Sequence, residues 1–166
     1  MKMNLGCGFD IKDGWLNANY YSHEPVEGAW YFDAREDQLD MTDKFDFILI
    51  NHVFSTLNAN DLRLVLANVK KWLKDGGKVH IIDMDITMAI AMYQNGHDEF
   101  PIKDGSIDYN FLMHVSGYGT RLSLFTPKYM AELLSSYGFK DIHPIPASDD
   151  EYDTRKLESL RFEATK

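Results

Sequence analysis

A pair of glycines near the N-terminus is the first feature with a chemical implication. Residues 3–10 begin as a short apolar strand and then read Gly6-Cys7-Gly8. Glycine lets the backbone turn with positive φ and come into contact with a ligand, so a strand that ends in two glycines suggests a binding turn. Tight turns without a ligand use the same pattern, and the third glycine of the dinucleotide fingerprint is absent. The pattern alone leaves a nucleotide-type site and a purely structural turn both open.

Polar residues also follow two later stretches that we predict as strands. Asp33 follows the aromatic stretch 29–32, and Asn51 and His52 follow the apolar run 45–50. An uninterrupted apolar run is typical of a strand buried on both faces, so 45–50 is predicted as the central strand. In an open α/β sheet, ligands bind beyond the carboxyl ends of such strands. We therefore expect Asn51 and His52 to face the same crevice as the glycine turn, although a polar residue there can also simply cap the next turn.

Two further patterns suggest other chemistry, and both are poorly supported. Asp83 and Asp85 form an Asp-X-Asp after the stretch 78–82, a pattern that holds a divalent metal in nucleotide-sugar transferases. No histidine or further acid has ligand spacing to this pair, so we predict no metal site. Cys7 is the single cysteine, which excludes an internal disulfide and a multi-cysteine metal site. Between two glycines it is interpreted as a small packing residue rather than a nucleophile.

The elements that position these residues alternate between strands and helices. Apolar residues at intervals of three and four predict a helix capped by Asn60 and ended by the stretch 75–77. Thr126 and Pro127 predict the start of another helix. Strand, helix and strand in this order imply a right-handed parallel crossover in an α/β fold. Further strands are predicted at 16–21, 78–82, 139–145 and 160–164.

Length and charge narrow the class of protein. A chain of 166 residues with 45% apolar content fits one domain, residues 1–166. The net charge of −9 repels phosphate backbones, so we expect no nucleic-acid partner. No segment approaches 18 uninterrupted apolar residues and no basic leader precedes one, so we expect neither a membrane anchor nor export. These signs favour a cytoplasmic protein, and its oligomeric state is left open.

The region 86–120 is less regular than the rest of the chain. Several glycines and Pro101 interrupt it, while methionines at 84, 88 and 92 are spaced to share a helical face. A long connection of this kind in a compact domain is usually a lid or a binding loop. We therefore predict that this region covers the site and contributes to the acceptor pocket.

Four segments in order resemble class I S-adenosylmethionine (SAM)-dependent methyltransferases, in particular a small bacterial and phage group. They are Asn4-Leu5-Gly6-Cys7-Gly8, Asp33-Ala34, the stretch 45–48 with Asn51-His52-Val53, and the Leu-Lys-Asp-Gly-Gly of 73–77. Each motif alone is permissive, but the order and spacing of all four make the match specific. The resemblance implies a Rossmann-like sheet of seven strands, mostly parallel with one antiparallel strand near an edge, and helices on both faces.

The resemblance also implies which residues hold SAM. Gly6 and Gly8 would let the backbone approach the methionine half, with Asn4 and Cys7 in the same turn. Asn19 stands where relatives place an acid on the ribose hydroxyls, and Asn4 stands where many relatives also carry an acid. The cofactor set implied in full is Asn4, Gly6, Cys7, Gly8, Asn19, Asp33, Ala34 and Asn51, with Asp33 and the Ala34 amide at the adenine.

The function that this resemblance implies is methyl transfer from SAM to a small-molecule acceptor by in-line displacement. Holding the methyl donor and the acceptor in line can by itself supply much of the catalysis. A base is needed only where the acceptor has a proton to lose. His52 is the first candidate near the transferred methyl, and His114 and Tyr118 are candidates because relatives recruit acceptor contacts from that region. A cofactor-binding or scaffold protein without turnover is the alternative. It is motivated by Asn19 and by Phe54-Ser55-Thr56-Leu57, which stands where relatives usually carry the sequence "LEHL".

Overall fold

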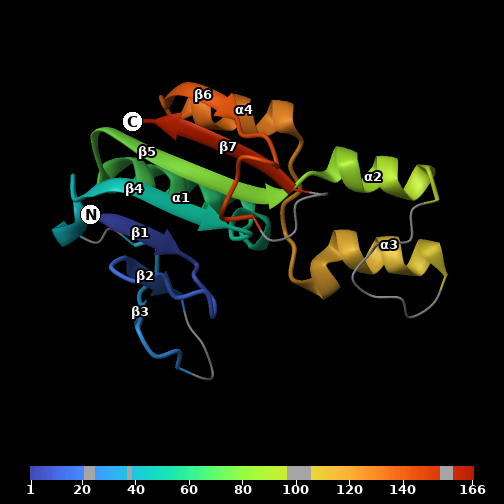
Figure 1. Ribbon diagram of the computed structural model, residues 1–166, viewed down its shortest axis with the longest axis horizontal. Coiled ribbons are helices and arrows are strands. Elements are labelled where there is room, and N and C mark those ends of the chain that lie inside the picture. Colours follow the sequence, from blue (N-terminus) through green and yellow to red (C-terminus); the bar gives the residue numbers. More distant parts are fainter. Residues whose placement is uncertain (21–24, 37–38, 97–105, 154–158) are drawn as a thin grey trace.

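Two mostly buried strands form the centre of the molecule, because their apolar residues repeat without the alternation of a half-exposed strand. β4 (Phe45–Asn51) and β5 (Leu73–Met84) pair in parallel. The computed structural model describes residues 1–20, 25–36, 39–96, 106–153 and 159–166. Its sheet has seven strands in the order β3-β2-β1-β4-β5-β7-β6 (Figure 1).

The predicted mixed sheet is confirmed. The first five strands are parallel, and β7 is antiparallel to both of its neighbours, β5 and β6. Because β1, β2 and β4 run in the same direction, their carboxyl ends lie at one edge. The remaining strands are β1 (Lys2–Leu5), β2 (Leu16–Asn19), β3 (Ala29–Tyr31), β6 (Lys140–Pro144) and β7 (Ser159–Thr165).

The helices α1 (Ala59–Trp72) and α4 (Pro127–Ser136) share one hydrophobic core with the sheet. In Figure 1 both lie behind the strands. Thr126 caps α4 and Pro127 is at its first position, as predicted. The core comprises the apolar stripe of α1 (Leu62, Val65, Leu66 and Val69), Met130 and Leu134 of α4, and residues of β1, β4, β5 and β7.

Both predicted ends of α1 are wrong. Asn58, not Asn60, is the cap, because its side chain accepts hydrogen bonds from the backbone of Asn60 and Asp61. The helix ends at Trp72, and Leu73 already pairs with Phe45 in the sheet. The glycines expected to stop the helix therefore lie inside β5, next to an irregular register that the positive φ of Gly76 accommodates.

The region expected to be irregular contains two helices, α2 (Ile86–Gln94) and α3 (Ile107–Ser116). Asp85 and Ser106 cap their N-termini, and Gly117 ends α3 in the left-handed conformation. Figure 1 shows the pair extending away from the carboxyl end of β5. Pro101 and Gly105 lie outside the described residues. The role of this region as a lid stays a prediction.

The second face of the sheet carries Phe47 and His80. On this face Trp15 packs against Phe47, and Tyr152 packs against both Phe47 and His80. Three short 3₁₀ helices complete the described chain: η1 (Leu39–Met41), η2 (Phe54–Thr56) and η3 (Gly117–Gly119). Among the described residues, no helix is long and apolar enough to cross a membrane.

Candidate active site

The two glycines of the N-terminal turn have different roles. A Cβ on Gly6 would lie 2.1 Å from Val53 Cγ2, and Gly6 has φ of 75°. Only glycine therefore lets this turn pack against the segment that follows β4. Gly8 also has positive φ, but a Cβ there would meet nothing within 4 Å. Gly6 is required by the packing of the protein itself, whereas the space beside the Gly8 Cα is open.

Two asparagines hold the turn in place. Buried Asn4 donates from Nδ2 to the Asp10 carbonyl at 2.7 Å. Asn19 accepts from the Gly8 amide at 2.9 Å and donates to the Gly8 carbonyl at 3.1 Å. The predicted ribose contact of Asn19 would therefore use the second lone pair of Oδ1. Cys7 is buried, which raises the pKa of its thiol and disfavours the thiolate.

A cavity of about 240 Å³ lies beside this turn. It brings together three of the predicted cofactor residues, Gly6, Asp33 and Ala34. Sequence reasoning missed most of the rest of the lining, which comes from the end of β2, the segment after β4 and the first turns of α1. The other lining residues are Leu5, Tyr20, Phe32, Arg35, Val53, Thr56, Leu57, Asp61 and Val65.

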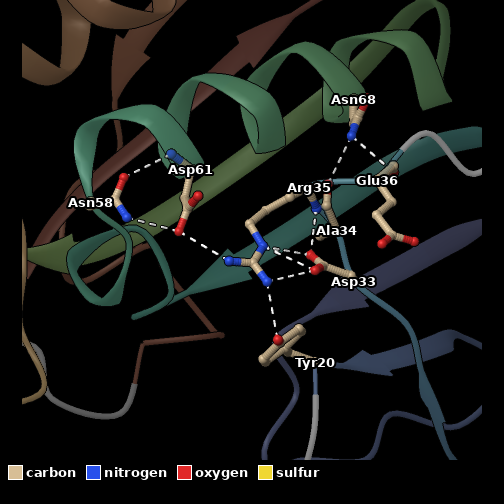
Figure 2. Close-up of polar contacts among 8 residues, drawn as sticks. All are labelled: Tyr20, Asp33, Ala34, Arg35, Glu36, Asn58, Asp61 and Asn68. Carbon is tan, nitrogen blue, oxygen red and sulfur yellow. Dashed lines mark hydrogen bonds and ion pairs between the residues drawn. The ribbon is translucent and has the colours of Figure 1, made fainter.

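Arg35 lies across this cavity and binds Asp33 (Figure 2). Its Nε and Nη2 reach both carboxylate oxygens of Asp33 at 2.6–3.0 Å, and its backbone amide donates to Oδ1 at 2.9 Å. These hydrogen bonds lower the pKa of Asp33 and raise that of Arg35. The guanidinium also reaches Asp61 at 3.2 Å and the Tyr20 hydroxyl at 3.0 Å. Asp33 is therefore ionised at neutral pH.

His52 leaves β4 with φ of 55°, a left-handed conformation that is uncommon outside glycine. Its backbone amide donates to the Ile82 carbonyl at 2.7 Å, which fixes it beside the end of β5. There Nδ1 lies 3.9 Å from Oδ1 of Asp83, within ion-pair distance. The structure thus places the predicted catalytic histidine near an acid considered above only as a metal ligand, and the two form an ion pair only when His52 is protonated.

Asp83 is fully buried, and its carboxylate accepts backbone hydrogen bonds from Ser55 at 2.9 Å and Met84 at 2.8 Å. Burial raises the pKa of Asp83 above its ordinary value. These donors and the charge of Arg121 lower it, but they offset only part of the rise. Asp85 instead caps α2. Among the described residues, no group of three acidic, histidine or cysteine side chains is arranged to hold a metal.

The remaining predicted site residues are distributed over two segments. His114 is buried on α3, and Arg121 donates to its carbonyl while also acting on Asp83, so this histidine belongs to the same end of the molecule as His52. The side chain of Tyr118 lies outside what the structure describes. Asn51 donates to the Tyr152 carbonyl at 3.2 Å, and its buried Oδ1 has no hydrogen-bond partner among the described residues.

A sheet of this order, with a glycine turn after β1 and an acid after β3, defines the class I SAM-dependent methyltransferase fold. Solved structures agree. A SAM-dependent methyltransferase from Archaeoglobus fulgidus superposes with a TM-score of 0.67 at 14% identity, over 99% of this chain and 85% of that one. The 1,6-didemethyltoxoflavin-N1-methyltransferase of Burkholderia thailandensis does so with a TM-score of 0.59 at 17% identity, over 99% and 70%.

Sequence comparison identifies the family. Residues 6–144 match the methyltransferase domain family, to which this chain belongs. The chain is 26% identical over 151 residues to O-methyltransferase 3 of Dictyostelium discoideum, covering 88% of this chain and 31% of that protein. It is 32% identical over 112 residues to tRNA N(3)-cytidine methyltransferase METTL6 of Mus musculus, covering 66% and 36%. The chain thus spans about a third of the length of these curated relatives. The resemblance noted in the sequence is confirmed.

Proposed function

We propose that this protein transfers the methyl group of SAM to a small-molecule acceptor. The observation that carries the proposal is the placement of the Asp33 cavity and the His52–Asp83 pair at the carboxyl edge of the same parallel strands. This edge is where open α/β sheets bind ligands. One part offers a mainly apolar pocket with two carboxylates, Asp33 and Asp61, and the other offers a proton acceptor, His52.

The residues of this edge fit SAM. Asp33 would accept from the adenine amino group, and Tyr20 and Phe32 line the same cavity with aromatic surface. The open space beside Gly8 would admit the amino-acid half, and the Oδ1 of Asn51, which has no hydrogen-bond partner among the described residues, is an acceptor suited to an ammonium group. When bound, SAM supplies a methyl group on a sulfonium, which is a good leaving group for in-line displacement.

His52 would remove the acceptor proton where the acceptor has one to lose. A neutral imidazole gains a positive charge when it takes a proton, and Asp83 lies at ion-pair distance to stabilise that charge. Because Asp83 is held by two backbone amides, it is already oriented before the proton moves. General-base catalysis of this kind contributes about 10²–10⁴-fold to the rate.

Charge supports a small acceptor over RNA. Of the two curated relatives, one is an O-methyltransferase and the other acts on tRNA. A protein of net charge −9 repels a phosphate backbone, which RNA-binding proteins attract with clustered lysines and arginines. A small molecule is therefore a better match to the charge of this chain than RNA.

The test uses SAM labelled in its methyl group, with a cell extract separated into a small-molecule fraction and an RNA fraction. We expect label in the small-molecule fraction only. His52→Asn should lower that rate about 10²–10⁴-fold, because asparagine tolerates the left-handed backbone but is no base. His143→Asn, on exposed β6, is the matched control and should leave the rate unchanged. Label in RNA would overturn the acceptor class.

The same experiment also tests the alternative function, in which the protein binds the cofactor but transfers no methyl group. One observation favours that alternative: Asn19 is tied to Gly8 by both ends of its amide, so the ribose would lack the charged acceptor that relatives provide. Binding of S-adenosylhomocysteine (SAH) in calorimetry, without label in either fraction, would establish the alternative.

A further inference from the structure

Arg35 and the adenine amino group require the same atoms. Both oxygens of Asp33 already accept from the guanidinium, and Oδ1 also accepts from the Arg35 backbone amide. Three N–H groups make these four contacts, because the single Nε hydrogen is shared between the two oxygens, and a carboxylate offers about four lone-pair sites, so little acceptor capacity is left for an incoming donor. An adenine amino group that binds Asp33 therefore competes with the hydrogen bonds of Arg35.

The same guanidinium also covers the aromatic surface of the cavity. Its carbon lies 5.0 Å from the centre of the Tyr20 ring, a cation–π distance, while Nη2 donates to the Tyr20 hydroxyl. Tyr20 is the largest exposed aromatic side chain in the cavity lining, at 65% exposure. A planar base that stacks on this face of the ring would compete with Arg35.

Asp61 provides a second partner at the opposite side of the guanidinium (Figure 2). Nη1 reaches Asp61 Oδ2 at 3.2 Å, and Asn58 donates to the same oxygen at 3.0 Å. Asp61 belongs to α1, whereas Asp33 follows β3, so the two acids are held by different elements. Arg35 can release Asp33 and keep an ion pair with Asp61.

We propose that Arg35 is a latch that competes with adenine for Asp33, sets the affinity for the cofactor, and turns to Asp61 when adenine binds. The inference rests on the proposed assignment of this cavity to the cofactor. It adds to the cofactor site a residue that sets affinity, because a ligand that binds Asp33 has to compete with the Arg35 contacts. The side chains of Arg35 and Asp33 are 34% and 19% exposed, so the latch is weak enough to open.

Calorimetry with SAH tests the latch. Arg35→Met keeps the side-chain length and removes the competitor, so we expect its Kd for SAH to fall about threefold to fivefold below that of the wild type. Arg63→Met is the matched control, because Arg63 is exposed on α1, lies outside the cavity lining and carries the same charge. Its Kd should equal that of the wild type.

Two further measurements separate competition from a general charge effect. Salt weakens the Asp33–Arg35 ion pair, so wild-type affinity for SAH should rise with salt concentration, while Arg35→Met shows no such rise. Asp61→Asn removes the second partner and should weaken SAH binding in the wild type but not in the Arg35→Met background. A double-mutant cycle measures that coupling directly.

The outcomes also distinguish this inference from the proposed function. Unchanged or weaker SAH binding in Arg35→Met would overturn the latch and leave the methyltransferase proposal in place. If the wild type binds no SAH, or if Asp33→Ala binds it as tightly as the wild type, the cavity is not the adenine site. In that case both the assignment and the latch fail.

Discussion

At the scale of single residues, the contacts of Asp33 decide what the site can do. Its position after an aromatic strand predicts an acceptor at the strand edge, and the structure confirms that it lines the cavity. The residue that modifies it, Arg35, is two positions away in sequence, but its reach to Tyr20 and Asp61 depends on the fold. Sequence reasoning therefore identifies the acid and misses its competitor.

The Asp33–Arg35 pair predicts a pH dependence of stability. Arg35 lowers the pKa of Asp33 in the folded state, below the ordinary value of about 3.9. The pair therefore contributes stability that is fully present above about pH 5 and is lost as the pH falls through the lower folded pKa. We expect the free energy of unfolding, measured with urea, to fall more between pH 6 and pH 3 in the wild type than in Asp33→Asn. Equal losses in the two proteins would contradict this.

At the scale of elements, the best predictions rest on local rules. Thr126 and Pro127 mark a helix start because capping involves residues three positions apart, and α4 begins where they predict. The prediction of Asn60 as a cap fails because the helix begins one residue earlier, at Ala59, where Asn58 accepts from the amides of Asn60 and Asp61. Nothing in the local pattern distinguishes two asparagines so close together.

The glycine turn and the segment after β4 act as one packed unit, and this can be measured. Gly6→Ala forces a Cβ into Val53 and keeps a left-handed backbone, so we expect it to lower the free energy of unfolding by about 2–4 kcal/mol. Gly8→Ala adds only backbone strain, so we expect it to lower the free energy of unfolding by about 1–2 kcal/mol.

Combining Gly6→Ala with Val53→Ala should recover part of the loss, because the truncated side chain leaves room for the new methyl group. Urea unfolding of both single variants and the double variant measures the coupling. Additive losses would show that Val53 does not oppose Gly6 in solution.

At the scale of the whole molecule, a buried polar pair holds the chain over the second face of the sheet. His80 Nε2 lies 2.9 Å from Asp150 Oδ2, and these side chains are only 6% and 0% exposed. Tyr152, two residues on, packs on His80 and Phe47, and burial raises its pKa to about 12. This segment covers the face of the sheet that carries Phe47 and His80.

His80→Ala should therefore lower the free energy of unfolding by about 2–3 kcal/mol, since it leaves a buried carboxylate with one fewer partner. His143→Ala removes a histidine that is 52% exposed and should change stability by less than about 0.5 kcal/mol. Thermal and urea unfolding of the two variants check this. A similar small effect of both would mean that the His80 contact does not hold this segment.

The sequence by itself determined the alternation of strands and helices in an α/β fold, the glycine turn and the polar residues at the strand ends. These follow from strand periodicity, capping and turn chemistry, which act over a few neighbouring residues. Only the tertiary structure decided which side chains meet: Gly6 with Val53, His52 with Asp83, and Arg35 with Asp61 across 26 positions. Such pairs depend on strand order and on where each loop returns, and no local pattern encodes either.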